Sequence, residues 1–368
     1  MKTVLVSLGD RSYPIFIERG SLNSLGRLIR KRNISGNALV VSQKEVLDHY
    51  QKALHASLAS QGFEPFYFVT PKVKSSEATK SQKVFLKLLK KIASVDGQNK
   101  SIFLIAFGGG VIGDLAGFAA SVYRRGIPCV QVPTTLTAQV DSAIGGKTGI
   151  DLPEGKNLIG SIYQPALVVC DPDTLKSLPD RHWSDGFAEV IKYGVIKDPR
   201  LFGLLEKNGL EGIHKNRRQL EEIIHRCAGI KAKVVEQDEW DKKGVRVILN
   251  FGHTAGHAIE AAAKFSRGYT HGEAVAIGML VACDIARKLE VLEDEALVSR
   301  IEKTLIKFNL PVFYKGLELE AILRAISYDK KQVNGANRFV LPVSLGKVKA
   351  VSDIPMNVVI QALERRKG

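Results

Sequence analysis

Residues 101–120, SIFLIAFGGGVIGDLAGFAA, constrain the fold most, because a fully apolar stretch runs into three glycines and then into a helical pattern. Such an apolar run is typical of a strand buried on both faces, as in a parallel sheet. Gly108, Gly110 and Gly113 fit G-x-G-x-x-G after a strand and at the start of a helix. Glycines there permit a tight turn, and the helix N-terminus offers N–H groups to a pyrophosphate. We therefore expect dinucleotide binding; the alternative is a turn that only packs helix on strand.

The same alternation of strand and helix runs through the first half of the chain. Strands are predicted at residues 3–8, 13–18, 38–42, 63–70, 101–107, 128–135 and 166–171. Helices are predicted at residues 21–32, 44–62, 81–95 and 113–124. This order indicates a mainly parallel sheet covered by helices on both faces.

The pattern changes near residue 180, after which the periodic segments are almost all helical. Residues 338–351, RFVLPVSLGKVKAV, are the exception and predict a late hairpin. A chain of 368 residues also exceeds the roughly 250–300 residues of one ordinary core. We expect a Rossmann-like α/β nucleotide-binding domain at 1–179 and a mainly helical domain at 180–368.

Composition excludes several classes of protein. Apolar residues make up 45% of the chain and charged residues 25%, as in soluble globular proteins. The N-terminal residues lack the apolar core of a signal peptide, and no stretch approaches the ~18 apolar residues of a membrane span. The four cysteines are widely spaced and include no CxxC pair, which indicates reduced thiols and neither a disulfide framework nor a cysteine-zinc site. A cytoplasmic protein without a membrane partner is expected.

The net charge of +15 does not by itself indicate a nucleic-acid partner. The basic clusters RLIRKR, KLLKKI, HKNRRQ and ERRKG lie on separate helical segments with apolar residues between them. No aromatic-basic alternation or nucleic-acid-binding motif accompanies them. We expect solvated helix faces and no nucleic-acid partner, although a positive field would attract an anionic substrate.

Three histidines and a glutamate form the strongest candidate site. His253 and His257 lie four residues apart in LNFGHTAGHAIE, hence on one helix face, and His271 opens another apolar helix. Glu189 and Lys192 lie one turn apart in GFAEVIKYG. Imidazole and carboxylate are the ligands of a catalytic zinc-type site. A pair of buried core histidines is the alternative, and the spacing leaves open which histidines are ligands.

Residues 134–165 are rich in glycine, and they carry Asp141, Lys147, Lys156 and Asn157. A segment this long without periodicity favours a functional loop. Its lysines could bind phosphate; a solvated loop with incidental cations is the alternative.

Several long motifs resemble 3-dehydroquinate synthase: FGGGVIGDLAGFAA, RGIPCVQVPTTLTAQVDSAIGGKTGID, GKNLIGSIYQP, GFAEVIKYG, LNFGHTAGHAIE and HGEAVAIGM. They follow one another in order from about residue 75 to Asp329–Lys331. The resemblance implies a lyase that converts 3-deoxy-D-arabino-heptulosonate 7-phosphate into 3-dehydroquinate and phosphate. It further implies NAD, which oxidises the substrate transiently, a divalent metal such as zinc or cobalt, and a homodimer.

The resemblance also implies roles for individual residues. Glu189, His253 and His271 match the metal ligands, and His257 matches the histidine that transfers protons. Substrate contacts are implied for Arg125, Asp141, Lys147, Lys156, Asn157, Lys192, Lys231, Arg246, Asn250 and one of Lys330 and Lys331. NAD contacts are implied for Ser75, Glu77, Lys80, Gly110, Val111, Ile112, Gly113, Asp114, Thr134, Thr135, Lys147, Lys156, Thr174, Leu175 and Ser177. Arg125 is expected near the partner's site.

The chain departs from the family pattern in three places. Ser75-Ser76 precede Glu77 where the family usually has Asp-Gly, and Gln43 stands where Asp or Asn is common. Both changes are expected to weaken contacts with the adenosine half of NAD. The segment between Lys231 and Arg246 is one residue longer, so Asp241 is the expected acidic residue there.

Two related enzyme types are the nearest alternatives: a metal-dependent polyol dehydrogenase and a cyclase that makes a different carbocycle. A dehydrogenase needs no phosphate pocket, so Lys147, Lys156, Asn157 and Arg246 count against it. The other cyclase would keep most of the site. A binding protein that lost catalysis is disfavoured by the intact histidine and glutamate set.

Overall fold

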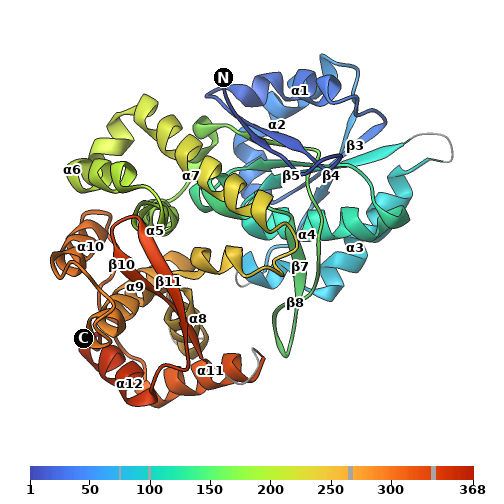
Figure 1. The fold of residues 1–368 in the computed structure, drawn as a ribbon. Helices are drawn as coiled ribbons and strands as arrows, with labels where there is room; N and C mark the ends of the chain where they lie inside the picture. Colours follow the sequence, from blue (N-terminus) through green and yellow to red (C-terminus); the bar gives the residue numbers. More distant parts are fainter. Residues whose placement is uncertain (74–75, 98–100, 264–267, 333–336) are drawn as a thin grey trace. The chain divides into compact units, whose positions relative to one another are not determined.

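The computed structural model describes residues 1–73, 76–97, 101–263, 268–332 and 337–368 (Figure 1). The chain divides into two compact units. The first contains Met1–Pro179 and Ile224–Trp240, and the second contains Asp180–Ile223 and Asp241–Gly368. Among the residues described, no helix combines the length and the apolar character needed to cross a membrane.

A seven-stranded sheet forms the centre of the first unit. Its order is β1-β2-β9-β6-β5-β3-β4; β1 and β2 are antiparallel, and the other neighbours are parallel. The strands are β1 (Lys2–Val6), β2 (Tyr13–Ile17), β3 (Asn37–Ser42), β4 (Pro65–Val69), β5 (Ile102–Gly108), β6 (Cys129–Pro133) and β9 (Leu167–Cys170). Each strand predicted in this half is present, so the predicted α/β class is confirmed.

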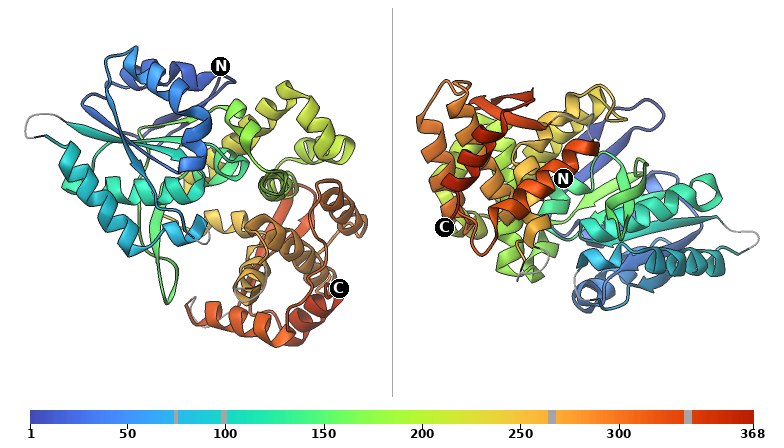
Figure 2. Two further views of the ribbon diagram at one scale, coloured as in Figure 1. Left: turned by 180° about the vertical axis from the view of Figure 1, so that it is seen from behind. Right: turned by 90° about the horizontal axis from the view of Figure 1, so that it is seen from below.

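Helices cover both faces of this sheet, because alternate residues of a strand point to opposite sides. Ala38 and Val40 of β3 join a core with α1 and α2, whereas Leu39 and Val41 join a second core with α3 and α4. Figures 1 and 2 show these helices on either side of the sheet. The helices are α1 (Leu25–Lys31), α2 (Lys44–Ala59), α3 (Gln82–Val95) and α4 (Gly110–Val122).

The glycine loop lies where this topology favours a ligand. From β3 the chain first adds β4 on one side and then returns to add β5 on the other side of β3. In open parallel sheets, ligands bind outside the carboxyl ends of the strands at such a reversal. Residues 108–110 leave β5 at that end and lead into α4.

Residues 134–165, predicted as a long irregular loop, contain regular structure. Ala138–Ser142 form a short π-helix, η4, and β7 (Lys147–Leu152) pairs with β8 (Gly155–Ile162) as an antiparallel hairpin. Glycines interrupt the apolar alternation that would have revealed these strands. They are needed for the pairing, because a Cβ at Gly160 would lie 2.2 Å from a backbone oxygen of β7.

The second unit is mainly helical, as predicted (Figure 2). The predicted late hairpin is also present, since β10 and β11 pair antiparallel. The elements are α5 (Asp180–Ile196), α6 (Pro199–Lys215), the first part of α7 (Arg217–Gln237), η6 (Val245–Asn250), α8 (His253–Ala262), α9 (His271–Lys288), α10 (Ala296–Lys307), α11 (Leu319–Gln332), β10 (Arg338–Ser344), β11 (Lys347–Ser352) and α12 (Met356–Arg365).

One segment lies in a different unit from the one the sequence indicated. We placed residues 224–240 in the second domain, but they group with the first unit. A tertiary contact explains this, because Lys231 on α7 donates to the carbonyl oxygen of Asp141 at 2.8 Å. Helical periodicity alone could not reveal a partner so far away in the chain.

Helices α8 and α9 approach each other closely because glycines line their contact. A Cβ at Gly278 would lie 2.0 Å from the backbone oxygen of Gly252. One at Gly256 would lie 3.0 Å from a backbone carbon of α9. The three histidines of the predicted metal site lie on these two helices.

Gly278→Ala is expected to destabilise the chain by about 1–3 kcal/mol or more, since the added methyl must push α8 and α9 apart. Gly203→Ala on α6 is the matched control, because no atom lies within 4 Å of its new methyl. Replacing this glycine within a helix should raise the free energy of unfolding of the chain by about 0.5–1 kcal/mol. Urea unfolding measures both. Wild-type stability of Gly278→Ala would contradict the close contact.

Candidate active site

Three imidazoles converge in the second unit. His253 and His257 lie one turn apart on α8, and His271 is the first residue of α9. The ring centroids are 5.2 to 5.7 Å apart, and one ring nitrogen of each histidine lies within 4.8 Å of the others. The glycine-lined contact between the helices thus brings the predicted histidines together.

The carboxylate of Glu189, on α5, lies against two of these rings. Its Oε1 is 3.5 Å from His253 Nε2 and 3.3 Å from His271 Nε2, while Oε2 pairs with Lys192 Nζ. Glu189 and Lys192 are each 1% exposed. Burial by itself raises the pKa of Glu189, but the Lys192 ammonium and the charged His271 imidazole outweigh it and hold the pKa well below the ordinary value. The site therefore contains a permanent buried negative charge.

This donor set fits a divalent metal ion. Within the described part of the chain, both Glu189 oxygens are buried and accept no hydrogen bond of good geometry. Oxygen and imidazole nitrogen are suitable ligands for zinc-type ions. Glu189, His253 and His271 could therefore hold such an ion, as the family resemblance implies.

The two imidazoles beside Glu189 differ in charge. Burial lowers the pKa of His253 to about 3, although Glu189 partly opposes this change. Burial also acts to lower the pKa of His271, but Glu189 and Glu260 raise it to about 10. His253 is thus neutral at pH 7, whereas a metal bound by His271 would displace a proton.

Glu260 is a residue that the sequence reasoning missed. It lies on α8, and its Oε2 is 3.6 Å from His271 Nδ1. A carboxylate on the far nitrogen of a ligating histidine commonly fixes the orientation of its ring. The signal available in the sequence was its place three residues after His257, on the same helix face.

Four other predicted residues of this unit lie on two elements. Arg246 and Asn250 lie on η6, just before His253; Arg246 is 3% exposed, and Asn250 is exposed. Lys330 and Lys331 belong to α11, but their side chains lie outside the residues whose surroundings are described.

In the first unit, close packing accounts for several glycines of the predicted NAD loop. A Cβ at Gly110 would lie 2.7 Å from Ser142 Oγ, and one at Gly113 would lie 2.8 Å from Gln131 Oε1. Helix α4 begins at Gly110, so Val111, Ile112, Gly113 and Asp114 follow in its first turns. Gly113 therefore serves helix packing. The N–H groups of Ile112 and Gly113 donate to the carbonyl oxygen of Gly109 at 3.0 and 3.1 Å, so an anion at this helix start would be met by those of Gly110 and Val111.

Thr134 and Thr135 lie beside this loop at the end of β6. The Thr134 N–H donates to the carbonyl oxygen of Gly108 at 2.9 Å. The methyl carbon of Thr135 lies 3.0 Å from where a Cβ at Gly109 would stand. The structure thus brings both threonines to the glycine loop.

Another cluster of predicted cofactor contacts surrounds a buried lysine. Lys80, 3% exposed, lies 2.9 Å from Asp114 Oδ2 and 3.3 Å from Glu77 Oε1. It also donates to Asn157 Oδ1, and Asp151 Oδ1 is 3.9 Å away. Burial raises the pKa of Asp114 to about 6, although Lys80 opposes this change. Asp151 was missed because it lies in the unpredicted hairpin.

The predicted substrate contacts of this unit are partly paired with one another. Lys231 is 6% exposed and forms an ion pair with Asp141. Lys147 and Lys156 lie on the β7–β8 hairpin, and both are exposed. The Lys231–Asp141 pair is therefore held in place by a largely buried contact.

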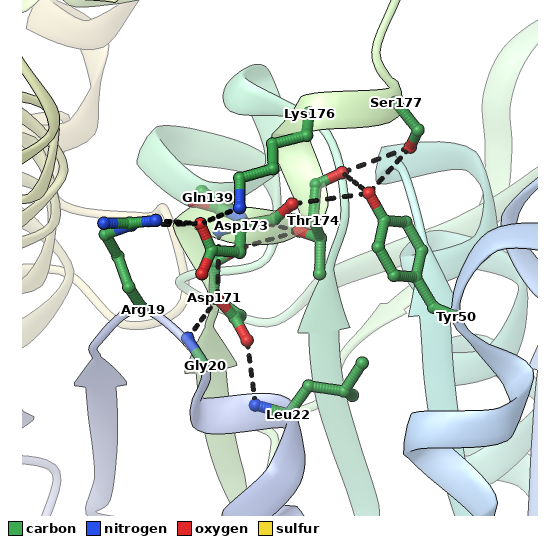
Figure 3. A network of polar contacts seen from close by, with 10 residues as sticks. All are labelled: Arg19, Gly20, Leu22, Tyr50, Gln139, Asp171, Asp173, Thr174, Lys176 and Ser177. Carbon is green, nitrogen blue, oxygen red and sulfur yellow. Dashed lines mark hydrogen bonds and ion pairs between the residues drawn. The ribbon is translucent and has the colours of Figure 1, made fainter.

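The predicted cofactor contacts after β9 lie in the short helix η5 (Pro172–Ser177). Thr174 is 1% exposed; its hydroxyl donates to the Asp171 carbonyl at 2.7 Å and accepts from Gln139 Nε2 at 3.2 Å. Leu175 is fully buried. The Thr174 hydroxyl is thus used to hold the loop itself (Figure 3), while the Leu175 side chain lies in the interior.

Figure 3 also shows how this loop is anchored. The Asp171 carboxylate accepts the N–H groups of Gly20 and Leu22 at 2.9 Å each. Tyr50 donates to Ser177 Oγ at 3.0 Å. Of the three NAD contacts predicted in this loop, Thr174 and Leu175 are buried, whereas the side chain of Ser177 is exposed to solvent. Ser75, predicted in the loop before Glu77, lies outside the described residues.

Arg125 lies in a strained, exposed turn after α4. Arg124 and Arg125 have φ angles of 48° and 62°, and Gly126 has 130°. Successive left-handed residues other than glycine cost free energy, so other contacts must hold them. Asp96 supplies these contacts, accepting from Tyr123 Oη at 2.7 Å and pairing with Arg124 at 2.8 Å. The turn therefore presents Arg125 to solvent in a fixed conformation.

Family models and known sequences match this chain over most of its length. A family model described as 3-dehydroquinate synthase N-terminal matches residues 70–185, and one described as 3-dehydroquinate synthase C-terminal matches residues 186–332. The 3-dehydroquinate synthase of Thermodesulfovibrio yellowstonii is 43% identical over 95% of this chain and 96% of its own. That of Caldanaerobacter subterraneus is also 43% identical, over 96% and 97%.

Solved structures of related enzymes share the fold. A 2-epi-5-epi-valiolone synthase from Streptomyces hygroscopicus, with NAD+ and Zn2+ bound, has a TM-score of 0.86 and 27% identity over 98% of both chains. A 2-deoxy-scyllo-inosose synthase with carbaglucose-6-phosphate, NAD+ and Co2+ has a TM-score of 0.85 and 25% identity over 99% of this chain and 100% of its own. A glycerol dehydrogenase from Schizosaccharomyces pombe, 18% identical with a TM-score of 0.63 over 95% and 88%, shows the fold alone.

His271→Ala is expected to abolish metal retention, because it removes one of the two imidazoles that lie against Glu189. His257→Ala is the matched control and should keep the metal. Elemental analysis after loading and desalting measures both variants, with circular dichroism to confirm folding. Wild-type metal content in folded His271→Ala would contradict the ligand set.

Proposed function

The chain belongs to the 3-dehydroquinate synthase family, and we propose that it converts 3-deoxy-D-arabino-heptulosonate 7-phosphate into 3-dehydroquinate and phosphate. This carbon–oxygen lyase reaction belongs to the shikimate pathway, which leads to the aromatic amino acids. One observation carries the proposal: Glu189, His253 and His271 converge in a chain 43% identical to 3-dehydroquinate synthases.

NAD and one divalent metal ion, zinc or cobalt, are the cofactors of this proposal. Support comes from the related cyclases, which were crystallised with NAD+ and Zn2+ or Co2+. When bound, NAD would accept a hydride from the substrate and later return it, and the metal would polarise substrate oxygens, so that oxidation, phosphate elimination, reduction and an intramolecular aldol step would leave no net redox change.

The metal ligands of the proposal are Glu189, His253 and His271. Lys192 pairs with Glu189 and keeps that carboxylate ionised in its buried position. Glu260 lies beside the far nitrogen of His271, where it favours a ring orientation that turns Nε2 toward Glu189.

His257 is the proton-transferring group of the proposal. Its side chain is exposed, so it can exchange a proton with solvent, while one of its nitrogens lies within 4.8 Å of the other two imidazoles. A general acid–base group needs this combination of access and proximity.

The residues proposed to bind NAD come from the first unit. The carboxylates around Lys80 can accept hydrogen bonds from the nucleotide's hydroxyl groups, and the start of α4 offers N–H groups to its phosphates. The set is Ser75, Glu77, Lys80, Gly110, Val111, Ile112, Gly113, Asp114, Thr134, Thr135, Lys147, Lys156, Thr174, Leu175 and Ser177.

The substrate carries a carboxylate and a phosphate, and both require charge-assisted hydrogen bonds. The proposed cations are Arg125, Lys147, Lys156, Lys192, Lys231, Arg246 and one of Lys330 and Lys331. Asp141, Asn157 and Asn250 are proposed to orient the substrate's hydroxyl groups or these cations.

Purified protein with the heptulosonate phosphate and NAD is expected to release phosphate without accumulating NADH. Omission of NAD or removal of the metal should stop the reaction. Phosphate is measured colorimetrically, and NADH by its absorbance. Stoichiometric NADH without phosphate would overturn the proposal and indicate a dehydrogenase.

His257→Ala separates metal binding from catalysis in the same assay. It should retain the metal and lose about 10²–10⁴-fold in kcat, the usual contribution of a general acid–base group. Full turnover by this variant would remove His257 from the mechanism while leaving the proposed reaction in place.

A cytoplasmic location and a homodimer complete the proposal. The four cysteines are buried and form no disulfide within the described part of the chain, which suits a reducing compartment. The fixed, exposed turn at Arg125 suits a residue that acts near a partner's site. Sedimentation velocity of the full chain is expected to give a dimer, and a monomer at micromolar concentration would contradict this part.

A further inference from the structure

A second carboxylate on α5 contacts the helix that carries His271. Asp185 lies one turn before Glu189, and its Oδ1 accepts the backbone N–H of Gly272, the residue after His271. Glu189, on the same face of α5, lies 3.3 Å from the His271 ring. Two successive turns of α5 therefore contact two successive residues of α9.

The backbones of the two helices touch at this point. A Cβ at Gly272 would lie 2.2 Å from the carbonyl oxygen of Asp185 and 2.7 Å from its Cα. Glycine is thus required for the approach that lets the Asp185 carboxylate reach the N–H group. The spacing between α5 and the start of α9 is set by direct contact, without an intervening side chain.

Nearby contacts hold the first turn of α9 against movement. Thr270 and Glu273 form a capping box at its N-terminus. Arg181, one turn before Asp185, makes two hydrogen bonds of 2.7 Å with the Glu273 carboxylate. The start of α9 is therefore tied to α5 by a partly buried hydrogen bond and by an exposed bidentate ion pair.

We propose that Asp185 is a positioning residue that fixes the distance between Glu189 and His271. The inference rests on the proposed metal centre, in which both residues are ligands. Without the Asp185 bond, the Gly272 N–H loses its partner, and α9 stays tied to α5 through the exposed Arg181–Glu273 pair, whose long side chains allow the start of α9 to shift. Glu189 and His271 would then no longer be held at the separation that one ion requires.

The test is a Co2+ titration of the full-length chain, followed by its visible absorption and by competition with a chelator. Asp185→Ala is expected to weaken Co2+ affinity about 10- to 100-fold, the usual cost of losing a group that orients a ligand. The absorption bands should change as well, because they report the geometry of the ion's ligands. Asp185→Asn keeps an oxygen acceptor and should restore most of the affinity.

Asp198→Ala is the matched control. Asp198 also accepts backbone N–H groups in the first turn of a helix, those of Arg200 and Leu201 at 3.1 and 3.0 Å, but it caps its own helix α6, which carries no proposed ligand. Its loss should lower thermal stability by a similar amount and leave Co2+ affinity and spectrum unchanged.

The outcomes separate this inference from the proposed function. Wild-type affinity and spectrum in Asp185→Ala would overturn the positioning role alone. Equal losses of affinity in Asp185→Ala and Asp198→Ala would also overturn it, because they would show a general effect of stability. Failure of the wild-type chain to bind Co2+ would overturn the proposed metal centre, and this inference with it.

Discussion

The buried charge of Glu189 is the feature on which the second unit's chemistry depends. A carboxylate at 1% exposure stays ionised only if its surroundings compensate the loss of water. Lys192, one turn along the same helix, provides this compensation. The family resemblance implies that Lys192 contacts the substrate. Its ion pair with Glu189 shows that it also stabilises the ionised carboxylate. Without that ammonium, Glu189 would lose its largest favourable interaction and would be a poorer ligand for a cation.

Backbone contact is what makes the arrangement of ligands rigid. Glycines bring α8 against α9 at Gly252 and Gly278, and α9 against α5 at Gly272. Side chains in helix interfaces can adjust by changing rotamer, whereas touching backbones cannot. A site built on such elements keeps its geometry within narrow limits, which a metal with a strict set of ligands needs. The glycines of this chain therefore serve the site as much as the fold.

The sequence predicted the sheet well, because strands buried on both faces form continuous apolar runs that depend on no partner. It also predicted the helical second unit and the convergent histidines. The sequence-based prediction failed where a segment's structure or its domain depends on contacts with distant residues. The β7–β8 hairpin was hidden by its glycines, and Asp151 was missed with it. Residues 224–240 were assigned by local periodicity, although contacts such as that of Lys231 with Asp141 group them with the first unit.

The sequence alone also could not decide which of His253 and His257 is the proposed metal ligand and which is the proposed proton-transferring group. His253 and His257 share a helix face, so their spacing is symmetrical and cannot distinguish them. Glu189, from a distant part of the sequence, breaks the symmetry by lying against His253. The carbonyl oxygen of Phe251, 3.2 Å from His253 Nδ1, completes the distinction. If Nδ1 of His253 carries the proton and donates it to this oxygen, Nε2 keeps its lone pair on the side of Glu189, as a metal ligand requires. His257, in contrast, is exposed and can exchange protons with solvent.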